Sequence, residues 1–183
     1  MMEKPPFHPF TDIPQAKIVY TGKRFSVYHA ETPSKNGKLA KRDAVIHPGA
    51  VVILPILEDG QVVMIRNERI VVGKILWELP AGTLEPEEPP LETAHRELIE
   101  ETGYQASNMS FLASFYTSPG ICDEKIFAYM ACNLNYQGQK LDDTEDISVE
   151  ILPWAQILAW IKDGTIQDGK TISTLLYYQT YFL

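Results

Sequence analysis

Apolar positions along this chain form short continuous runs that predict strands. The run AVVILPIL, which begins at Ala50, and the run QVVMIRNER, which begins at Gln61, flank the turn sequence Glu58-Asp59-Gly60. Runs rich in β-branched residues on either side of such a turn are typical of neighbouring strands. Similar strand patterns occur at residues 17–31, 39–47, 110–117 and 125–134, and Asn36-Gly37 predicts a hairpin turn between the first two.

The spacing of apolar residues becomes helical at three places. One predicted helix covers residues 91–102, where Leu91, Ala94 and Leu98 lie on one side and Gly103 supplies a C-terminal stop. The proline-rich passage before this helix, LWELPAGTLEPEEPP, is expected to be a loop. Two more helices are predicted at residues 154–164 and from residue 171 onward. Strands mixed with two or three helices predict an α/β (α+β) sandwich.

Composition limits the classes of protein to consider. The 183 residues suffice for one domain with a small appendage and a sizeable core. A net charge of −8 argues against a general binder of nucleic acid or of anionic membranes. The apolar run at Ala50 is far shorter than the ~20 residues that span a bilayer. We therefore expect a soluble protein. Cys122 and Cys132 resemble no metal cluster, and two cysteines are typical of a reduced, cytoplasmic protein without a disulfide.

The predicted helix at residues 91–102 carries three glutamates on one side. Glu97, Glu100 and Glu101 fall within an arc of about 100° because each residue of an α-helix turns by about that angle. Such carboxylates repel one another, and a solvated acidic surface is the ordinary interpretation. Alternatively, they gather the hard oxygen ligands that Mg²⁺ or Mn²⁺ prefers, and bound cations relieve the repulsion. The histidines and cysteines are too scattered for a zinc site.

The sequence around these glutamates resembles a known family. Residues 82–104 read GTLEPEEPPLETAHRELIEETGY, which matches the Nudix box without a gap. The matching positions are Gly82, Glu88, Arg96-Glu97-Leu98, Glu100-Glu101 and Gly103. Tyr104 takes a place where an aliphatic residue is commoner. A solvated acidic surface requires none of the other residues at these distances, so the box favours the metal-binding interpretation.

The resemblance implies a fold, a reaction and a set of roles. We expect a Nudix α/β/α sandwich over residues 46–183, preceded over residues 1–45 by an arm and a small antiparallel β subdomain that dimerises. The implied reaction is hydrolysis of a nucleoside diphosphate linked to another group, in a divalent-metal site. The implied metal ligands are Glu97, Glu100, Glu101 and the carbonyl of Ala81. Arg96 resembles the residue that orients the glutamates, and Glu88 resembles a supporting carboxylate.

Sequence outside the box resembles the ADP-ribose pyrophosphatase branch of the family. HPGAVVILPIL, VVMIRNERIVVGKILWELPAG and SFYTSPGICDEKIFAYMA carry this resemblance. In that branch a proline follows the box glycine by about sixteen positions, as Pro119 follows Gly103, although Ser118-Pro119-Gly120 is also an ordinary turn. The implied products are AMP and ribose 5-phosphate. The alternatives are hydrolysis of another nucleotide sugar, such as GDP-mannose or a UDP-sugar, and a nucleotide-binding regulator without catalysis.

The same branch implies further residues that contact the substrate or the attacking water. Arg69 resembles the arginine that grips the pyrophosphate, and Phe25 an aromatic that stacks on adenine, although Phe25 could equally belong to the core. Glu145 resembles the loop glutamate that acts as general base, a role that Asp142, Asp143 or Asp146 can also take. The full set of predicted substrate-binding residues is Arg69, Arg66, Arg42, Phe25, Pro119 and Gly120. A nucleotide sugar is the expected partner, together with a second copy of the chain.

Overall fold

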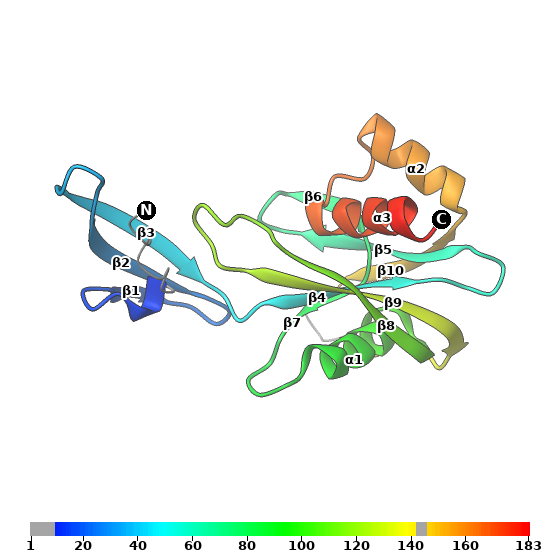
Figure 1. The fold of residues 1–183 in the computed structure, drawn as a ribbon. Coiled ribbons are helices and arrows are strands. Elements are labelled where there is room, and N and C mark those ends of the chain that lie inside the picture. Colours follow the sequence, from blue (N-terminus) through cyan, green and yellow to red (C-terminus); the bar gives the residue numbers. More distant parts are fainter. Residues whose placement is uncertain (1–9, 142–145) are drawn as a thin grey trace. The chain divides into compact units, whose positions relative to one another are not determined.

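The computed structural model describes residues 10–141 and 146–183, which form two compact units. The smaller unit contains the described residues up to Pro48 together with Ser118–Glu124, and the larger contains Gly49–Thr117 and Lys125–Leu183. Figure 1 shows the elements of both. The smaller unit does not consist of one continuous stretch, because residues 118–124 return to it.

The smaller unit is a three-stranded antiparallel sheet. A 3₁₀ turn at Phe10–Asp12 (η1) precedes its strands, β1 (Lys17–Thr21), β2 (Ser26–Pro33) and β3 (Leu39–Ile46), which pair in the order β1-β2-β3. Backbone bonds from Val45 N to Ile121 O (2.8 Å) and from Asp123 N to Val45 O (3.2 Å) join the returning segment to β3. Ala30 is the only buried apolar residue that the described part of this sheet contributes. The unit therefore has almost no core of its own.

The larger unit contains two sheets and three helices. One sheet has the order β7-β4-β9-β8 and the other the order β10-β5-β6. The strands are β4 (Ala50–Pro55), β5 (Val62–Arg69), β6 (Lys74–Glu78), β7 (Ala81–Thr83), β8 (Tyr104–Tyr116), β9 (Lys125–Tyr136) and β10 (Ile147–Leu152). The helices are α1 (Pro90–Thr102), α2 (Trp154–Asp163) and α3 (Gly169–Tyr181). Figure 1 shows α1 on one side of the sheets and α2 and α3 on the other.

Strand β4 explains the unbroken apolar run that begins at Ala50. Val51 and Ile53 pack with Ala94 and Leu98 of α1 on one face. On the opposite face, the side chains of Val52 and Leu54 join the core that β5, α2 and α3 complete. Because successive residues of a strand point to opposite faces, a strand buried on both sides is apolar at every position. Burial of this strand is what holds α1 against the sheet.

Two sequence expectations need correction. Leu91 does not anchor α1, because it is 43% exposed while Ala94 and Leu98 are fully buried. The passage at residues 76–90 is not wholly a loop, since Glu78 pairs with Ile65 in β5 and Gly82 pairs with Val51 in β4. Its prolines lie between and after these short strands, where they interrupt no hydrogen-bonded ladder. Among the described residues, none of the helices is both long and apolar enough to cross a membrane.

Candidate active site

Four charged residues on or just before α1 form what we call the helix cluster: Glu88, Arg96, Glu97 and Glu100. Arg96 Nε and Nη2 donate to the two carboxylate oxygens of Glu88, each at 3.0 Å. Arg96 Nη1 donates to Glu97 Oε1 and to Glu100 Oε2, both at 2.8 Å. The guanidinium therefore holds three carboxylates that would otherwise repel one another. Glu92, four residues before Arg96, is not among its partners.

The helix cluster perturbs the protonation of its members. Hydrogen bonds from Arg96 to Glu88, Glu97 and Glu100, together with the charge of Glu97, raise the pKa of Arg96 and keep it protonated. The bond from Arg96 in turn lowers the pKa of Glu88, assisted by a bond from Thr93 Oγ1 (2.9 Å). The arginine thus orients all three carboxylates and favours the ionised form of Glu88.

Glu101 faces the first residue of β7. Its Oε2 accepts a hydrogen bond from Ala81 N at 2.8 Å, and its side chain is almost fully buried. The next residue of β7, Gly82, lies so close to the helix cluster that a methyl group there would lie 1.9 Å from Glu97 Oε1. The absence of a side chain at Gly82 is therefore a steric requirement. The predicted ligands Ala81, Glu97, Glu100 and Glu101 lie on these two adjoining elements.

The donor set fits a hard divalent cation better than a soft one. Carboxylates and a backbone carbonyl are oxygen donors of the kind that Mg²⁺ and Mn²⁺ bind. The close approach of Gly82 to Glu97 shows that β7, which also carries Ala81, adjoins the carboxylates of α1. Within residues 10–141 and 146–183, however, no three histidine, cysteine or acidic side chains are already grouped as a metal site. Two of the predicted ligands, Glu97 and Glu100, accept hydrogen bonds from Arg96.

A second group of charges, which we call the buried cluster, consists of Arg69, Glu78, Asp168 and Lys170. Arg69 Nε and Nη2 donate to the two oxygens of Glu78 at 2.7 and 2.6 Å. Lys170 Nζ donates to Glu78 Oε2 at 2.6 Å and lies 3.0 Å from Asp168 Oδ1. Burial alone would raise the pKa of Glu78, but Arg69 and Lys170 hold it below its usual value. Both carboxylate oxygens of Glu78 therefore bind these cations.

The first turn of α3 connects the buried cluster to the turn at Ala81. Asp168 caps this helix by accepting from Thr171 N at 2.9 Å. The hydroxyl of Thr171 accepts a bond from Leu79 N, also at 2.9 Å. The sequence predicted a helix here but no link to the site. Glu78 and Lys170 are 92 residues apart, and a single sequence contains no spacing signal across such a distance.

The remaining predicted substrate-binding residues fall in both units. Arg66 lies on β5 with its guanidinium 5.5 Å from the centre of the Trp77 ring. Arg42, Phe25, Pro119 and Gly120 belong to the smaller unit. There, Arg42 Nε donates to Thr32 Oγ1 at 2.7 Å, and Pro119 and Gly120 lie in the segment that returns beside β3. Arg69 and Arg66 thus belong to the larger unit, and the other four residues belong to the smaller unit.

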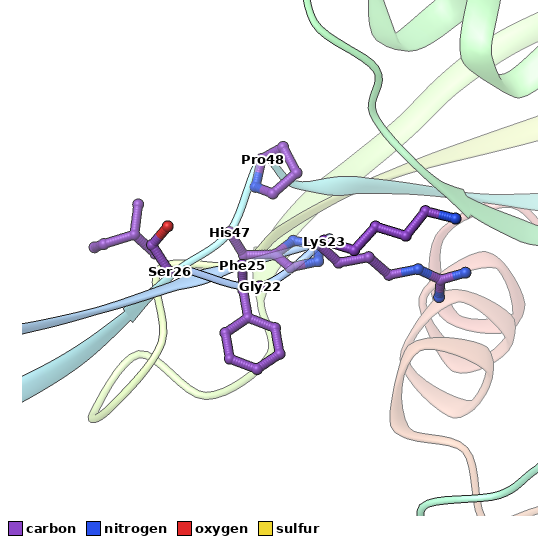
Figure 2. A pocket seen from close by; sticks show the side chains of 8 residues that line it. Gly22, Lys23, Phe25, Ser26, His47 and Pro48 are labelled. Carbon is purple, nitrogen blue, oxygen red and sulfur yellow. The ribbon is translucent and has the colours of Figure 1, made fainter. Parts of the chain in front are cut away.

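Phe25 borders a hollow of about 290 Å³ within the smaller unit. Figure 2 shows this hollow, with the rings of Phe25 and Pro48 on opposite sides. Phe25 is partly exposed and its ring centre lies 5.9 Å from that of Tyr20, so it is not a core residue of the described structure. Lys23 and Arg24 also line the hollow, so an aromatic ring bound there would have two cationic neighbours.

Glu145, predicted as the general base, lies outside the described residues, as do Asp142 and Asp143. The described residues on either side lie next to α1. Gln139 Nε2 donates to the carbonyl of Glu101 at 2.7 Å, and Lys140 N donates to that of Glu100 at 3.0 Å. Beyond the gap, β10 begins at Ile147 and pairs with Asn67 of β5. Both flanks are therefore held by elements of the larger unit.

Comparison with known proteins agrees with this geometry. A family model described as the NUDIX domain matches residues 46–175. The chain is similar to an ADP-ribose pyrophosphatase of Bacillus subtilis, with 36% identity over 88% of each protein. A Bacillus methanolicus protein named methanol dehydrogenase activator is 37% identical over the same shares. A GDP-mannose pyrophosphatase of Escherichia coli is 34% identical over 81% of this chain and 84% of its own.

A solved structure described as an ADP compounds hydrolase has the same fold. Its TM-score is 0.81 at 23% identity, and the match covers 92% of this chain and 91% of that one. The predicted Nudix sandwich is thereby confirmed. Nudix hydrolases generally use divalent metal ions, which agrees with the oxygen donors of α1 and the adjoining turn. By the family model and by identity over most of its length, this chain belongs to the Nudix family of hydrolases.

Proposed function

We propose that this chain is an ADP-ribose pyrophosphatase that releases AMP and ribose 5-phosphate. The observation that carries the proposal is the set of carboxylates on α1, where Arg96 orients Glu97 and Glu100 and where Glu101 accepts a bond from Ala81 N of β7. The substrate is proposed from the similarity to the B. subtilis enzyme of that name over 88% of both proteins. A second nucleotide sugar remains a candidate because E. coli relatives are named GDP-mannose pyrophosphatases.

The proposed roles follow the chemistry of a diphosphate. Its negative charge repels a nucleophile, and Mg²⁺ or Mn²⁺ neutralises this charge and lowers the pKa of bound water. Glu97, Glu100, Glu101 and the carbonyl of Ala81 would hold one or more such ions, with Arg96 orienting the glutamates. Arg69 would grip the pyrophosphate, since a guanidinium suits bidentate contacts to phosphate oxygens.

Glu145 is the proposed general base. Gln139 and Lys140, which precede it in the chain, bond to the last turn of α1. A carboxylate that accepts a proton from water must come within hydrogen-bond reach of that water when substrate is bound. Glu145→Gln should therefore lower kcat more than it raises KM for ADP-ribose.

The smaller unit is proposed to bind the nucleotide and to form a homodimer. Phe25 would stack on adenine, with Arg42, Pro119, Gly120 and, from the larger unit, Arg66 as further contacts. Exposed apolar side chains on β1 support dimerisation, because such side chains often mark a protein–protein interface. Ile18, Val19 and Tyr20 are 55–61% exposed. In this proposal, residues 1–45 form the dimerising part and residues 46–183 form the catalytic domain. Light scattering of the full chain should give twice the mass of the 183-residue protein.

We also propose that the protein works in the cytoplasm. Cys122 and Cys132 are both free thiols in the structure, and thiols persist in a reducing compartment. Localisation of a tagged chain in its native cell tests this assignment, and secretion of the chain would contradict it.

A substrate panel tests the proposed function. With Mg²⁺ present, we expect kcat/KM to be highest for ADP-ribose among ADP-ribose, GDP-mannose, UDP-glucose, NADH and diadenosine polyphosphates. The products should be AMP and ribose 5-phosphate, and EDTA should abolish their release. Preference for GDP-mannose would support the second candidate. A regulator without catalysis would bind nucleotide but release no AMP with or without Mg²⁺.

A further inference from the structure

The buried cluster differs from an ordinary ion pair because one of its members reaches the surface. The side chain of Glu78 is only 1% exposed and that of Lys170 is 16% exposed, whereas that of Arg69 is 36% exposed. Glu78 therefore forms the base of the cluster and Arg69 forms its outer end. The interior half of the cluster holds the guanidinium in one orientation.

The hydrogen bonds of Arg69 leave part of its guanidinium available. A guanidinium carries five N–H donors in a planar fork. Arg69 uses Nε and one donor of Nη2 for Glu78. Among the described residues, Nη1 makes no hydrogen bond. The edge formed by Nη1 and Nη2 thus retains donors in the geometry that suits phosphate oxygens. Arg96 differs, because carboxylates contact all three of its nitrogens.

Lys170 determines the charge that a phosphate would meet at Arg69. The buried cluster contains two cations, Arg69 and Lys170, and two anions, Glu78 and Asp168, so it is formally neutral. Without Lys170 it would carry one net negative charge in a partly buried place, where charges interact strongly. Glu78 would then bind Arg69 alone, and an incoming diphosphate would compete with an unshared carboxylate.

We propose that Lys170 is a positioning residue that shares Glu78 with Arg69 and so leaves the guanidinium oriented and able to bind the substrate diphosphate. This inference rests on the proposed function, in which Arg69 grips that group. Lys170 acts from the first turn of α3, which Asp168 caps and which Thr171 ties to Leu79. The C-terminal helix thereby supports a binding residue on β5.

The test compares three variants of the full-length protein. Lys170→Met removes the charge and Lys170→Arg keeps it. Lys162→Met is the matched control, because Lys162 is an exposed lysine in the last turn of α2. KM and kcat for ADP-ribose are measured with Mg²⁺, and Kd for ADP is measured by calorimetry in EDTA. Thermal unfolding reports the folded fraction of each variant.

We expect Lys170→Met to raise both KM and the Kd for ADP about tenfold, which corresponds to about 1.4 kcal/mol. Its kcat should stay within about threefold of wild type, since loss of uniform binding affects KM and not kcat. Lys170→Arg should restore KM, and Lys162→Met should change neither constant. If Lys170→Met does not fold, Lys170→Gln replaces it, because glutamine keeps a hydrogen-bond donor without the charge.

Two results would overturn the inference. One is a KM and an ADP affinity that stay at wild-type values when the charge is removed. The other is a loss of activity that follows only the folded fraction, with Lys170→Arg as impaired as Lys170→Met. Failure of the proposed function has a different signature, since wild type itself would then release no AMP from ADP-ribose.

Discussion

The helix cluster and the buried cluster each join an arginine to carboxylates, yet they are built in different ways. Arg96 and its partners lie one, four and eight residues apart along the chain. In the buried cluster, Glu78 is nine residues from Arg69 and 92 from Lys170. The first cluster is local in sequence, since all of its members lie on α1 or within two residues of its start. The second exists only because β5, β6 and α3 pack together.

The two clusters also differ in what surrounds them. Glu100 and Arg96 remain about one-third exposed, so water screens their charges. Glu78 is shielded from water, so its charge depends on Arg69 and Lys170 for compensation. The helix cluster is therefore suited to exchanging partners, as metal binding requires. The buried cluster is suited to keeping the side chain of Arg69 in one orientation.

The largest effect is expected at Glu101, which follows the helix cluster on α1. Glu101→Gln keeps an oxygen that accepts from Ala81 N but removes the negative charge of a proposed metal ligand. Loss of several kcal/mol of charge stabilisation should lower kcat about 100-fold or more. AMP release under Mg²⁺ measures the effect. Glu92→Gln, an exposed glutamate of the same helix, is the control, and near-normal turnover of Glu101→Gln would remove Glu101 from the ligand set.

The two clusters should differ in how much each contributes to the free energy of unfolding. Glu78→Gln leaves two cations without their buried partner, which we expect to cost about 3 kcal/mol of unfolding free energy. Glu88→Gln should cost about 1 kcal/mol, because Arg96 keeps Glu97 and Glu100. Urea unfolding at neutral pH measures both. Equal losses would mean that burial does not distinguish the clusters.

The same pair of variants has an expected pH dependence. Both Glu78 and Glu88 have a pKa below the ordinary glutamate value of 4.5 in the folded protein. Their stabilisation is therefore present above that value and is lost as pH falls through the lower, folded pKa. The stability gap between wild type and either variant should narrow in acid.

A smaller effect is expected at Gly82. An added methyl group would overlap the carboxylate end of Glu97, a flexible end that can move. Gly82→Ala should therefore lower kcat/KM about tenfold through a misplaced carboxylate, with less than about 1 kcal/mol lost in stability. Gly169→Ala is the control, since nothing lies within 4 Å of the position of its new methyl. Unchanged turnover of Gly82→Ala would show that the position of Glu97 does not matter.

Sequence predicted much of the fold, and the misses have physical causes. The apolar run at Ala50 predicted a strand from local residues alone, and the structure shows that this strand is buried on both faces. The strands at Glu78 and Gly82 were missed because their pairing partners, rather than their own composition, make them strands. Leu91 matched the helical period, but it lies in the first turn of α1, where its side chain is exposed and does not pack against the sheet.

For the site, the chain's local spacing determined that Glu97, Glu100 and Glu101 share one side of a helix with Arg96 in reach. These relations depend on helix geometry, which is the same in every fold. Only the tertiary structure decided that Glu101 meets Ala81, that Gly82 must lack a side chain, and that Lys170 reaches Glu78. Such contacts arise from the packing of distant elements, and no period along a single chain encodes them.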